Sequence, residues 1–424
     1  MESLPRTRGK IWLWALYDFA NSLAFVNVLF SFGLWFISEN GASDLWISVS
    51  VALTTIVLLL SLPVLGRMSD RMGRRLPFLA ASTFLSIGAL LTLGIVAAIG
   101  PVFTLPVTIL VFLIYSLFNL FYMACFPFYD SLLRSLKTRN NSLEGVSGIG
   151  MGAGQVGNIV GITLLLPIAT GKISLFGITG KGGVFIAAAI LFLLASLPVF
   201  LYFREEHVQL ASSEKLGKTL RETFADFRRI RQYPGVFAYL ITYALFADAL
   251  LTLSVFTSFY LDTVAHMDDT QKTMTFVLAM IFGIIGALMS PLFVRIFRGR
   301  KNAVTACIAF WAVVLAGFAF AHNTIVFSIF VVLNGFGFGA LFALSRAFFA
   351  ALVPPAKQAE MFGIYAIFER TASVLGPLLW SATAFAFASY GDDRYRFSVI
   401  ALAILIVISL FTFQYVREPE SFKE

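Results

Sequence analysis

Long apolar runs separated by short polar loops form the dominant pattern of this chain. A helix rises about 1.5 Å per residue, so about 20 apolar residues are enough to cross the hydrocarbon of a bilayer. The pattern predicts twelve such helices, at 11–38, 45–65, 78–99, 105–133, 144–169, 184–203, 235–261, 273–296, 302–321, 324–351, 358–388 and 395–416. The predicted fold class is therefore an all-α membrane protein.

One long polar stretch divides the twelve predicted helices into two sets of six. It predicts an N-terminal six-helix bundle at 1–203, a linker at 204–234 and a C-terminal six-helix bundle at 235–424. The second half of the linker has the pattern of an amphipathic helix that lies on the membrane surface.

The two halves also echo each other in sequence. ALYDFANS (15–22) and ALFADALL (244–251) each place an acid after an aromatic residue in the first helix of a half. The second helix of each half contains proline and ends in a basic loop, GRMSDRMGRR (66–75) in one and RIFRGRK (295–301) in the other. Two parallel six-helix halves are typical of rocking transporters that hold a substrate between them near the midplane.

Composition indicates a membrane protein, and the position of the basic loops explains its positive net charge. The chain is 59% hydrophobic and 13% charged, which leaves too little polar surface for a soluble globular protein of 424 residues. The net charge of +8 comes mainly from Lys and Arg in loops on the same side as the N-terminus. The positive-inside rule then predicts that both termini are cytoplasmic, and this topology removes the need for a nucleic-acid partner. Compact loops favour a bacterial inner membrane.

Enzyme and metal chemistry have no support in the sequence. Cys125 and Cys307 lie far apart in apolar runs, and the three histidines are isolated from one another. No metal-ligand spacing and no nucleophile–base motif is present. We therefore expect no metal, no cofactor and no enzymatic activity.

The loop GRMSDRMGRR is the most specific short motif. Its glycines allow a tight, closely packed turn, and its acid can accept hydrogen bonds from helix N-terminal amides. The loop resembles the one between the second and third helices of the major facilitator superfamily. The resemblance implies a conformational switch made of Gly66, Asp70, Arg71, Gly73 and Arg74.

A stripe of glycines on one face of the fifth predicted helix indicates close helix packing. Gly150, Gly154, Gly157 and Gly161 recur at helical spacing. Small residues at such positions let a neighbouring membrane helix approach closely.

Charged and polar side chains inside the predicted helices are the candidate transport residues. Burying them in hydrocarbon costs several kcal/mol unless they are paired or wet, so a membrane helix that keeps them does so for a reason. The set proposed for substrate binding or proton coupling is Asp18, Asn21, Asp248, Arg346, Tyr365, Glu369 and Arg370. Structural ion pairs, and snorkelling of Arg346 to the membrane surface, are the alternatives.

Several stretches resemble one branch of the superfamily, the vacuole-effluxer-like family, whose fungal members export amino acids from the vacuole. The stretches are WALYDFANSLAF, VSGIGMGAGQVGN, ALSRAFFAALVP and MFGIYAIFERTASVLGPLLW. They occur in the family's order and span most of the chain. The chain departs from the family pattern at Ala249, Ala347 and Glu369, and in the loop FRGRKN (297–302).

These observations together predict a secondary active transporter with alternating access and proton coupling. The favoured substrate is a small polar or zwitterionic metabolite, such as an amino acid or a short peptide. An exporter or flippase of a lipid or amphipathic drug-like molecule is the alternative transporter, and a non-transporting receptor or scaffold is the alternative outside that class. The expected partners are the substrate and the lipid bilayer, and the expected state is a monomer.

Overall fold

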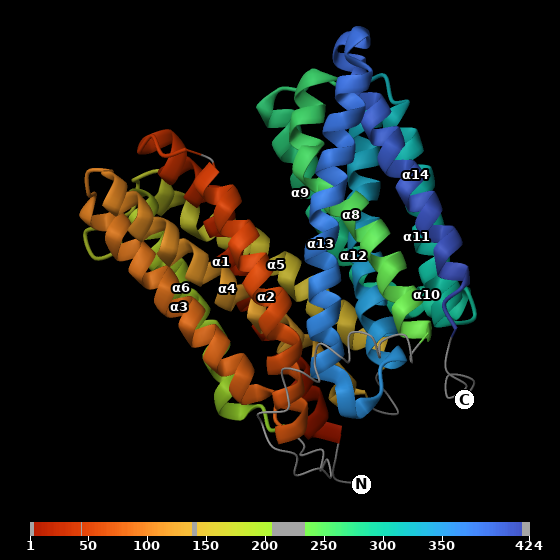
Figure 1. Ribbon diagram of the computed structural model, residues 1–424, viewed down its shortest axis with the longest axis horizontal. Coiled ribbons are helices and arrows are strands. Elements are labelled where there is room, and N and C mark those ends of the chain that lie inside the picture. Colours follow the sequence, from red (N-terminus) through yellow and green to blue (C-terminus); the bar gives the residue numbers. More distant parts are fainter. Residues whose placement is uncertain (1–3, 44, 138–141, 206–233, 418–424) are drawn as a thin grey trace. The chain divides into compact units, whose positions relative to one another are not determined.

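The computed structural model describes residues 4–43, 45–137, 142–205 and 234–417 (Figure 1). Within these ranges the side chains at 4–7, 38, 48, 234, 269 and 370–374 are not described. The predicted surface helix of the linker falls at 206–233, outside the described residues.

Helices account for almost all of the described chain. The α-helices are α1 (Leu4–Gly33), α2 (Leu45–Met72), α3 (Leu76–Ile99), α4 (Leu105–Ser131), α5 (Leu143–Ala169), α6 (Gly180–Tyr202), α8 (Pro234–Thr263), α9 (Asp269–Leu288), α10 (Ser290–Ile296), α11 (Arg300–Ala319), α12 (Thr324–Leu352), α13 (Gln358–Ala386) and α14 (Arg394–Gln414). Short helical turns add η1 (Leu34–Glu39), η2 (Leu133–Leu136), η5 (Pro355–Lys357) and η6 (Ala388–Asp393).

The predicted twelve-helix membrane fold is confirmed. Eleven helices within the described residues are long and apolar enough to cross a bilayer. The twelfth is α13, whose described residues include the shorter apolar helical segment Leu375–Ala386. In hydrocarbon a helix satisfies its backbone hydrogen bonds internally, which explains why this apolar chain forms helices throughout.

One predicted helix is broken in the structure. The eighth predicted run, at 273–296, forms two helices, α9 and α10, with Met289 between them. Pro291 causes the break, because proline has no N–H to donate and its ring clashes with the preceding turn. Prolines within α2, α4, α5, α6 and α13 leave those helices continuous.

The described chain forms two compact units. The first contains residues 1–136, 153–213 and 356–364, and the second contains residues 137–152, 214–355 and 365–424. The beginning of α5 thus belongs to the second unit, and the beginning of α13 belongs to the first. The predicted division into 1–203 and 235–424 stays a prediction.

Helix packing repeats between the units. In the first unit, the pairs α1–α6, α2–α4, α3–α4 and α3–α6 are in extensive contact. In the second unit, the corresponding pairs α8–α14, α9–α12, α11–α12 and α11–α14 are in contact as well. The weak sequence echo therefore reflects one packing scheme used twice.

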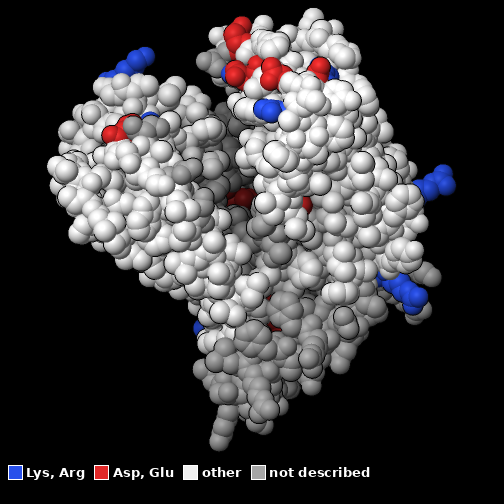
Figure 2. Space-filling model, turned by 45° about the horizontal axis from the view of Figure 1, so that its top comes forward, with Lys and Arg blue, Asp and Glu red and all other residues white. Residues whose placement is uncertain are grey.

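The outer faces of the helices are apolar, as a lipid-facing surface requires. On α4, Ile109, Leu113 and Leu117 form an exposed stripe at four-residue spacing, whereas Val111 and Phe118 are buried. In Figure 2 most of the described surface that is visible carries no charge, and acidic side chains gather at one end of the second unit.

Three glycines of the predicted stripe, Gly154, Gly157 and Gly161, lie against α1 in the first unit. A Cβ atom on Gly157 would lie 2.3 Å from the carbonyl oxygen of Phe19, and one on Gly161 would lie 2.7 Å from that of Leu23. Gly154 faces the side chain of Asp18, and Gly150 is buried at the start of α5. Glycine lets the two helices approach to backbone contact.

We predict that Gly157→Ala destabilises the protein, because its methyl group has no space and overpacking costs about 1–3 kcal/mol. The matched control is Gly88→Ala on α3, where a Cβ atom would meet nothing within 4 Å. Replacing an unconstrained helical glycine by alanine stabilises by about 0.5–1 kcal/mol. Thermal unfolding in detergent should therefore move the two variants in opposite directions. Equal midpoints would argue against backbone contact at Gly157.

Candidate functional site

Asp18 lies on α1 within an aromatic cluster of the first unit. Its side chain is largely buried, and its Oδ2 accepts a hydrogen bond from the hydroxyl of Tyr129 on α4 at 3.2 Å. The Trp14 ring stacks on the Tyr129 ring with centroids 4.5 Å apart, and the Trp14 indole N–H donates to the Tyr129 carbonyl oxygen at 3.0 Å. A phenol held in this way presents its hydroxyl to a carboxylate inside the helical bundle.

Two neighbours of Asp18 on α1 complete the polar patch of the first helix. Asn21 is buried, and its Oδ1 has no hydrogen-bond partner among the described residues. Ser22 and Asp18 both face Gly154 on α5, where a Cβ atom would lie 2.9 Å from Ser22 Oγ and 3.2 Å from Asp18 Oδ1. The glycine therefore provides the space that these two side chains occupy.

Asp248 repeats this arrangement in the second unit. It lies on α8, is 2% exposed, and its Oδ1 accepts the backbone N–H of Gly376 on α13 at 2.7 Å. A Cβ atom on Gly376 would lie 2.0 Å from Thr252 Oγ1 and 2.8 Å from Asp248 Oδ1. In each half, the first membrane helix (α1 or α8) carries an aspartate and, four residues later, a side chain with a hydroxyl group. Both side chains face a glycine on the fifth membrane helix of that half (α5 or α13).

Glu369 and Tyr365 lie together on α13, as their spacing predicts, and contact α8. The hydroxyl of Tyr243 on α8 donates to Glu369 Oε2 at 2.6 Å. The rings of Tyr243 and Tyr365 stack with centroids 4.0 Å apart. The second unit therefore also contains a carboxylate on a membrane helix that accepts a hydrogen bond from a tyrosine hydroxyl.

Arg346 on α12 contacts the beginning of α5. Its Nε donates to Ser147 Oγ at 3.1 Å and its Nη2 donates to the Ser147 carbonyl oxygen at 3.0 Å. Ser147 Oγ in turn donates to the carbonyl oxygen of Ala343 at 2.7 Å. The predicted Arg370 has no described side chain, so the structure does not place it.

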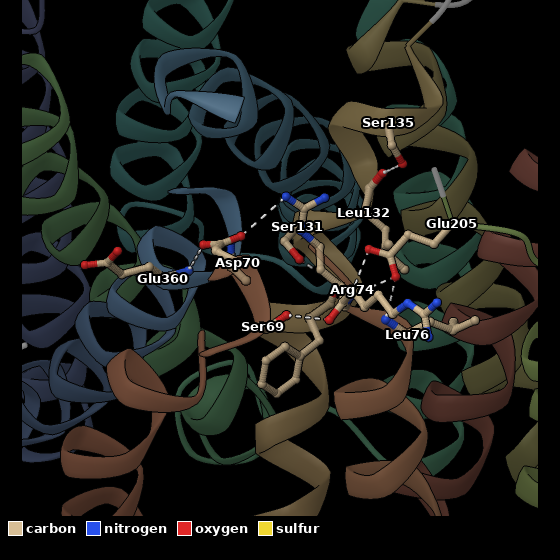
Figure 3. Close-up of polar contacts among 12 residues, drawn as sticks. Ser69, Asp70, Arg74, Leu76, Ser131, Leu132, Ser135, Glu205 and Glu360 are labelled. Carbon is tan, nitrogen blue, oxygen red and sulfur yellow. Dashed lines mark hydrogen bonds and ion pairs between the residues drawn. The ribbon is translucent and has the colours of Figure 1, made fainter. Parts of the chain in front are cut away.

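Asp70 of the predicted switch loop binds the first turn of α13. Its Oδ1 accepts the N–H of Ala359 at 3.2 Å, and its Oδ2 accepts the N–H of Glu360 at 2.9 Å (Figure 3). Arg75 Nη2 lies 3.4 Å from Asp70 Oδ1. A helix N-terminus has amides without partners in the helix and a positive dipole end, so it favours a carboxylate here.

The other predicted loop residues shape this contact. A Cβ atom on Gly66 would lie 2.6 Å from the Ala359 carbonyl oxygen, so the close approach requires glycine. Gly73 has a φ of +61°, which lets the chain turn after α2. Arg71 is half-buried and Arg74 is exposed on the same loop.

Several contact residues were missed by the sequence-based reasoning. Glu205, just after α6, accepts the N–H of Arg75 at 2.7 and 2.8 Å and that of Leu76 at 2.9 Å (Figure 3). Tyr129, Tyr243 and Ser147 were missed as well. An acid directly after an apolar run, on the same side as the basic loop, was the only signal for Glu205.

Metal ligation has no support in the described part of the chain, where no group of three or more His, Cys, Asp or Glu residues could hold an ion.

Comparison with known families decides what kind of protein carries these features. Residues 26–424 match the family model described as "Vacuole effluxer Atg22 like". The chain belongs to this family. The resemblance noted in the sequence is therefore confirmed over almost the whole length.

Relatives of the Atg22-like chain occur in bacteria and fungi. It is 26% identical over 429 residues to the uncharacterized MFS-type transporter YxiO of Bacillus subtilis (strain 168), covering 96% of this chain and 95% of that protein. It is 26% identical over 167 residues to autophagy-related protein 22 of Saccharomyces cerevisiae (strain ATCC 204508 / S288c), covering 37% of this chain and 31% of that protein.

Solved structures confirm the major facilitator fold. A bacterial homologue of the iron transporter ferroportin has a TM-score of 0.74 at 16% identity, covering 96% of this chain and 98% of the other. The E. coli fucose:proton symporter FucP has a TM-score of 0.70 at 12% identity, covering 99% of this chain and 100% of the other. The family match and the transporter relative in Bacillus subtilis, together with this fold, identify the protein as a multi-pass membrane transporter of the major facilitator type and not an enzyme.

We predict that Asp70→Asn loosens the first turn of α13. Each carboxylate oxygen accepts one of the two N–H groups, and asparagine replaces one of these oxygens with an NH2 group, which cannot accept. A hydrogen bond to a charged group is worth about 1.5–3 kcal/mol. Backbone hydrogen exchange across 356–364 should become faster by about tenfold or more, since about 1.4 kcal/mol is a factor of ten. Hydrogen-exchange mass spectrometry of the membrane protein measures this.

The control for this exchange measurement is Asp262→Asn, whose carboxylate is exposed and pairs with Lys272 at 2.8 Å. It should leave exchange at 356–364 unchanged. Unchanged exchange in Asp70→Asn as well would show that the carboxylate does not hold this turn.

Proposed function

We propose that this Atg22-like protein is a proton-coupled secondary transporter of a small polar or zwitterionic metabolite, with an amino acid or short peptide favoured. The observation that carries the proposal is a repeated pair. In each unit a carboxylate inside a membrane helix accepts a hydrogen bond from a tyrosine hydroxyl, Asp18 from Tyr129 and Glu369 from Tyr243. The family's description as vacuole effluxers supports export.

Such a pair suits a group that binds and releases a proton. The ionised carboxylate accepts from the phenol, and the protonated carboxyl can donate to the phenol oxygen instead, since a tyrosine hydroxyl both donates and accepts. The pair keeps a hydrogen bond in both states. An ionisable group within the membrane that keeps a polar partner in either state is a reasonable carrier of the coupling proton.

The hydrogen-bond partners of the remaining candidate residues suggest different roles for them. The buried Asn21 Oδ1 is an acceptor that a substrate ammonium group would satisfy. Asp248 binds the backbone of α13, the helix that carries Glu369, so we assign it the positioning of that helix. Direct substrate or proton contact by Asp248, Arg346 and Arg370 stays a prediction.

In alternating access, the contacts of Asp70 and Arg346 would have a role in the conformational change. Asp70 joins α2 to the first turn of α13, and Arg346 joins α12 to the first turns of α5. Each contact links the two halves of the sequence, so we propose that both break and re-form during transport. In this proposal both termini are cytoplasmic, and the protein works as a monomer in a bacterial inner membrane.

We predict that Glu369→Gln and Asp18→Asn lose the response to an imposed pH gradient. The measurement is uptake of a radiolabelled amino-acid mixture into proteoliposomes. Because Tyr243→Phe removes only one charge-assisted hydrogen bond, worth about 1.5–3 kcal/mol, it should slow the flux by roughly tenfold without abolishing the pH response. The control Asp262→Asn should behave like the wild type.

Full pH-driven uptake by both carboxylate variants would rule out these residues as proton carriers. Binding of amino acids to the wild type without any flux would favour a receptor over a transporter.

A further inference from the structure

The loop between α5 and α6, at 170–179, has no role in the contacts described so far. It lies at the end of the first unit opposite to the switch loop, because Glu205, after the other end of α6, binds the switch loop. The loop reads TGKISLFGIT, and no acidic residue occurs from 145 to 204. Its only charges are therefore positive, Lys172 within the loop and Lys181 in the first turn of α6.

A two-residue turn forms the tip of this loop. Leu175 and Ile178 exchange both of their backbone hydrogen bonds, each at 2.9 Å. The two residues between them, Phe176 and Gly177, have φ values of +52° and +77°. Positive φ at both central residues defines the type I′ turn, which favours asparagine and glycine. The segment 173–178 is the α5–α6 hairpin.

Phe176 is an unfavourable residue for the first central position of this turn. In the left-handed region the Cβ atom of an L-residue comes too close to the following carbonyl oxygen, and a bulky side chain makes such a conformation a strained outlier. The Phe176 side chain is also 81% exposed, so it gains little from packing within the chain. The residue therefore costs free energy twice, through backbone strain and through exposed apolar surface.

The base of the hairpin is fixed to the two helices. Gly171, with a φ of +75°, ends α5, and the Ile173 amide donates to the Pro167 carbonyl oxygen at 3.1 Å. On the α6 side, a Cβ atom on Gly183 would lie 2.9 Å from the Ile178 carbonyl oxygen. These contacts hold the exposed ring at a defined place beside the helix ends.

The loop between α3 and α4 is exposed and apolar at the same end of the unit. The two loops are neighbours, since a Cβ atom on Gly182 of α6 would lie 2.7 Å from the amide nitrogen of Ala98 on α3. No charged residue occurs from 99 to 105. Five large apolar side chains at this end are more than half exposed: Ile99, Val102, Leu105, Ile173 and Phe176.

The lipid bilayer is the partner that this apolar surface fits. The ten residues of the loop join two membrane helices, so its tip reaches at most about 15 Å from the helix ends. The headgroup layer beyond the hydrocarbon is about 5–8 Å thick, which leaves the apolar phase within reach of the exposed ring. Lys172 and Lys181 complement lipid phosphates, and the loop has no acid to oppose them.

We propose that the α5–α6 hairpin is an interfacial anchor, which inserts the Phe176 ring among the lipids and so sets the depth of α5 and α6 in the bilayer. Burial of the ring in lipid compensates for the strain and the exposure that it has in the protein alone. Side chains anchored at the interface determine how a membrane helix sits in the bilayer. The proposal does not depend on the transported substrate.

The test uses a nitroxide label on Ile173→Cys, in a background with Cys125→Ala and Cys307→Ala, in vesicles of phosphatidylethanolamine and phosphatidylglycerol. Its collision rates are measured with oxygen, which dissolves in hydrocarbon, and with a water-soluble nickel chelate. With Phe176 present, the label should collide mainly with oxygen. Phe176→Asn should raise the collision rate with the nickel chelate about tenfold, because loss of one buried aromatic side chain weakens insertion by at least that factor.

Asparagine favours the type I′ turn, so Phe176→Asn removes the apolar ring without opposing the hairpin. Phe176→Trp should keep the low collision rate, and a rise in both variants would show that the turn and not insertion places the label, which would overturn the proposal. The control label on Asp392→Cys, at an exposed position of η6, should collide often with the chelate whether or not Phe176 is replaced.

Equal nickel collision rates at Ile173→Cys with and without Phe176→Asn would contradict the anchor. Spin–spin broadening between labels would indicate that a second copy of the chain covers the ring in place of lipid, and would overturn the proposal as well. The readout needs no substrate, so it can fail or succeed independently of the pH-driven flux.

Discussion

The free-energy cost of polar and charged groups in hydrocarbon determines most of this structure. Backbone groups within the bilayer must be satisfied inside a helix, and an ionised side chain there costs several kcal/mol without a partner. The chain meets the first demand with twelve helices. It meets the second by giving the three carboxylates Asp18, Glu369 and Asp248 a donor each, from Tyr129, Tyr243 and the Gly376 amide.

The same solutions occur twice, once in each half. The helix pairs that pack in one unit pack in the other, and an aspartate followed by a hydroxyl faces a glycine on the fifth helix in both. After the second helix of each half, a loop contacts the start of another helix: Asp70 binds amides of α13, and Arg300 pairs with Glu144 of α5. A duplicated frame with equivalent contacts in both halves supports the proposed rocking between two states.

Hydropathy alone predicted the twelve helices, because spanning a bilayer needs a run of fixed length whatever its neighbours are. The switch loop and the glycine stripe were also recognisable, since both depend on local spacing. The tyrosine partners were not, because the chain has 13 tyrosines and only tertiary packing selects Tyr129 and Tyr243. The break at Met289 was missed because prolines in other helices of this chain leave those helices continuous. The Glu144–Arg300 pair was missed because residues 156 apart in sequence give no local signal.

The most direct test is whether the carboxylates within the helices exchange protons with water. Infrared difference spectra of the protein in proteoliposomes, recorded between acidic and neutral pH, report carboxyl groups that change protonation. The account predicts a carboxyl C=O band that disappears in Glu369→Gln and shifts in Tyr243→Phe, while Asp262→Asn retains it. A spectrum that is identical in the wild type and Glu369→Gln would contradict it.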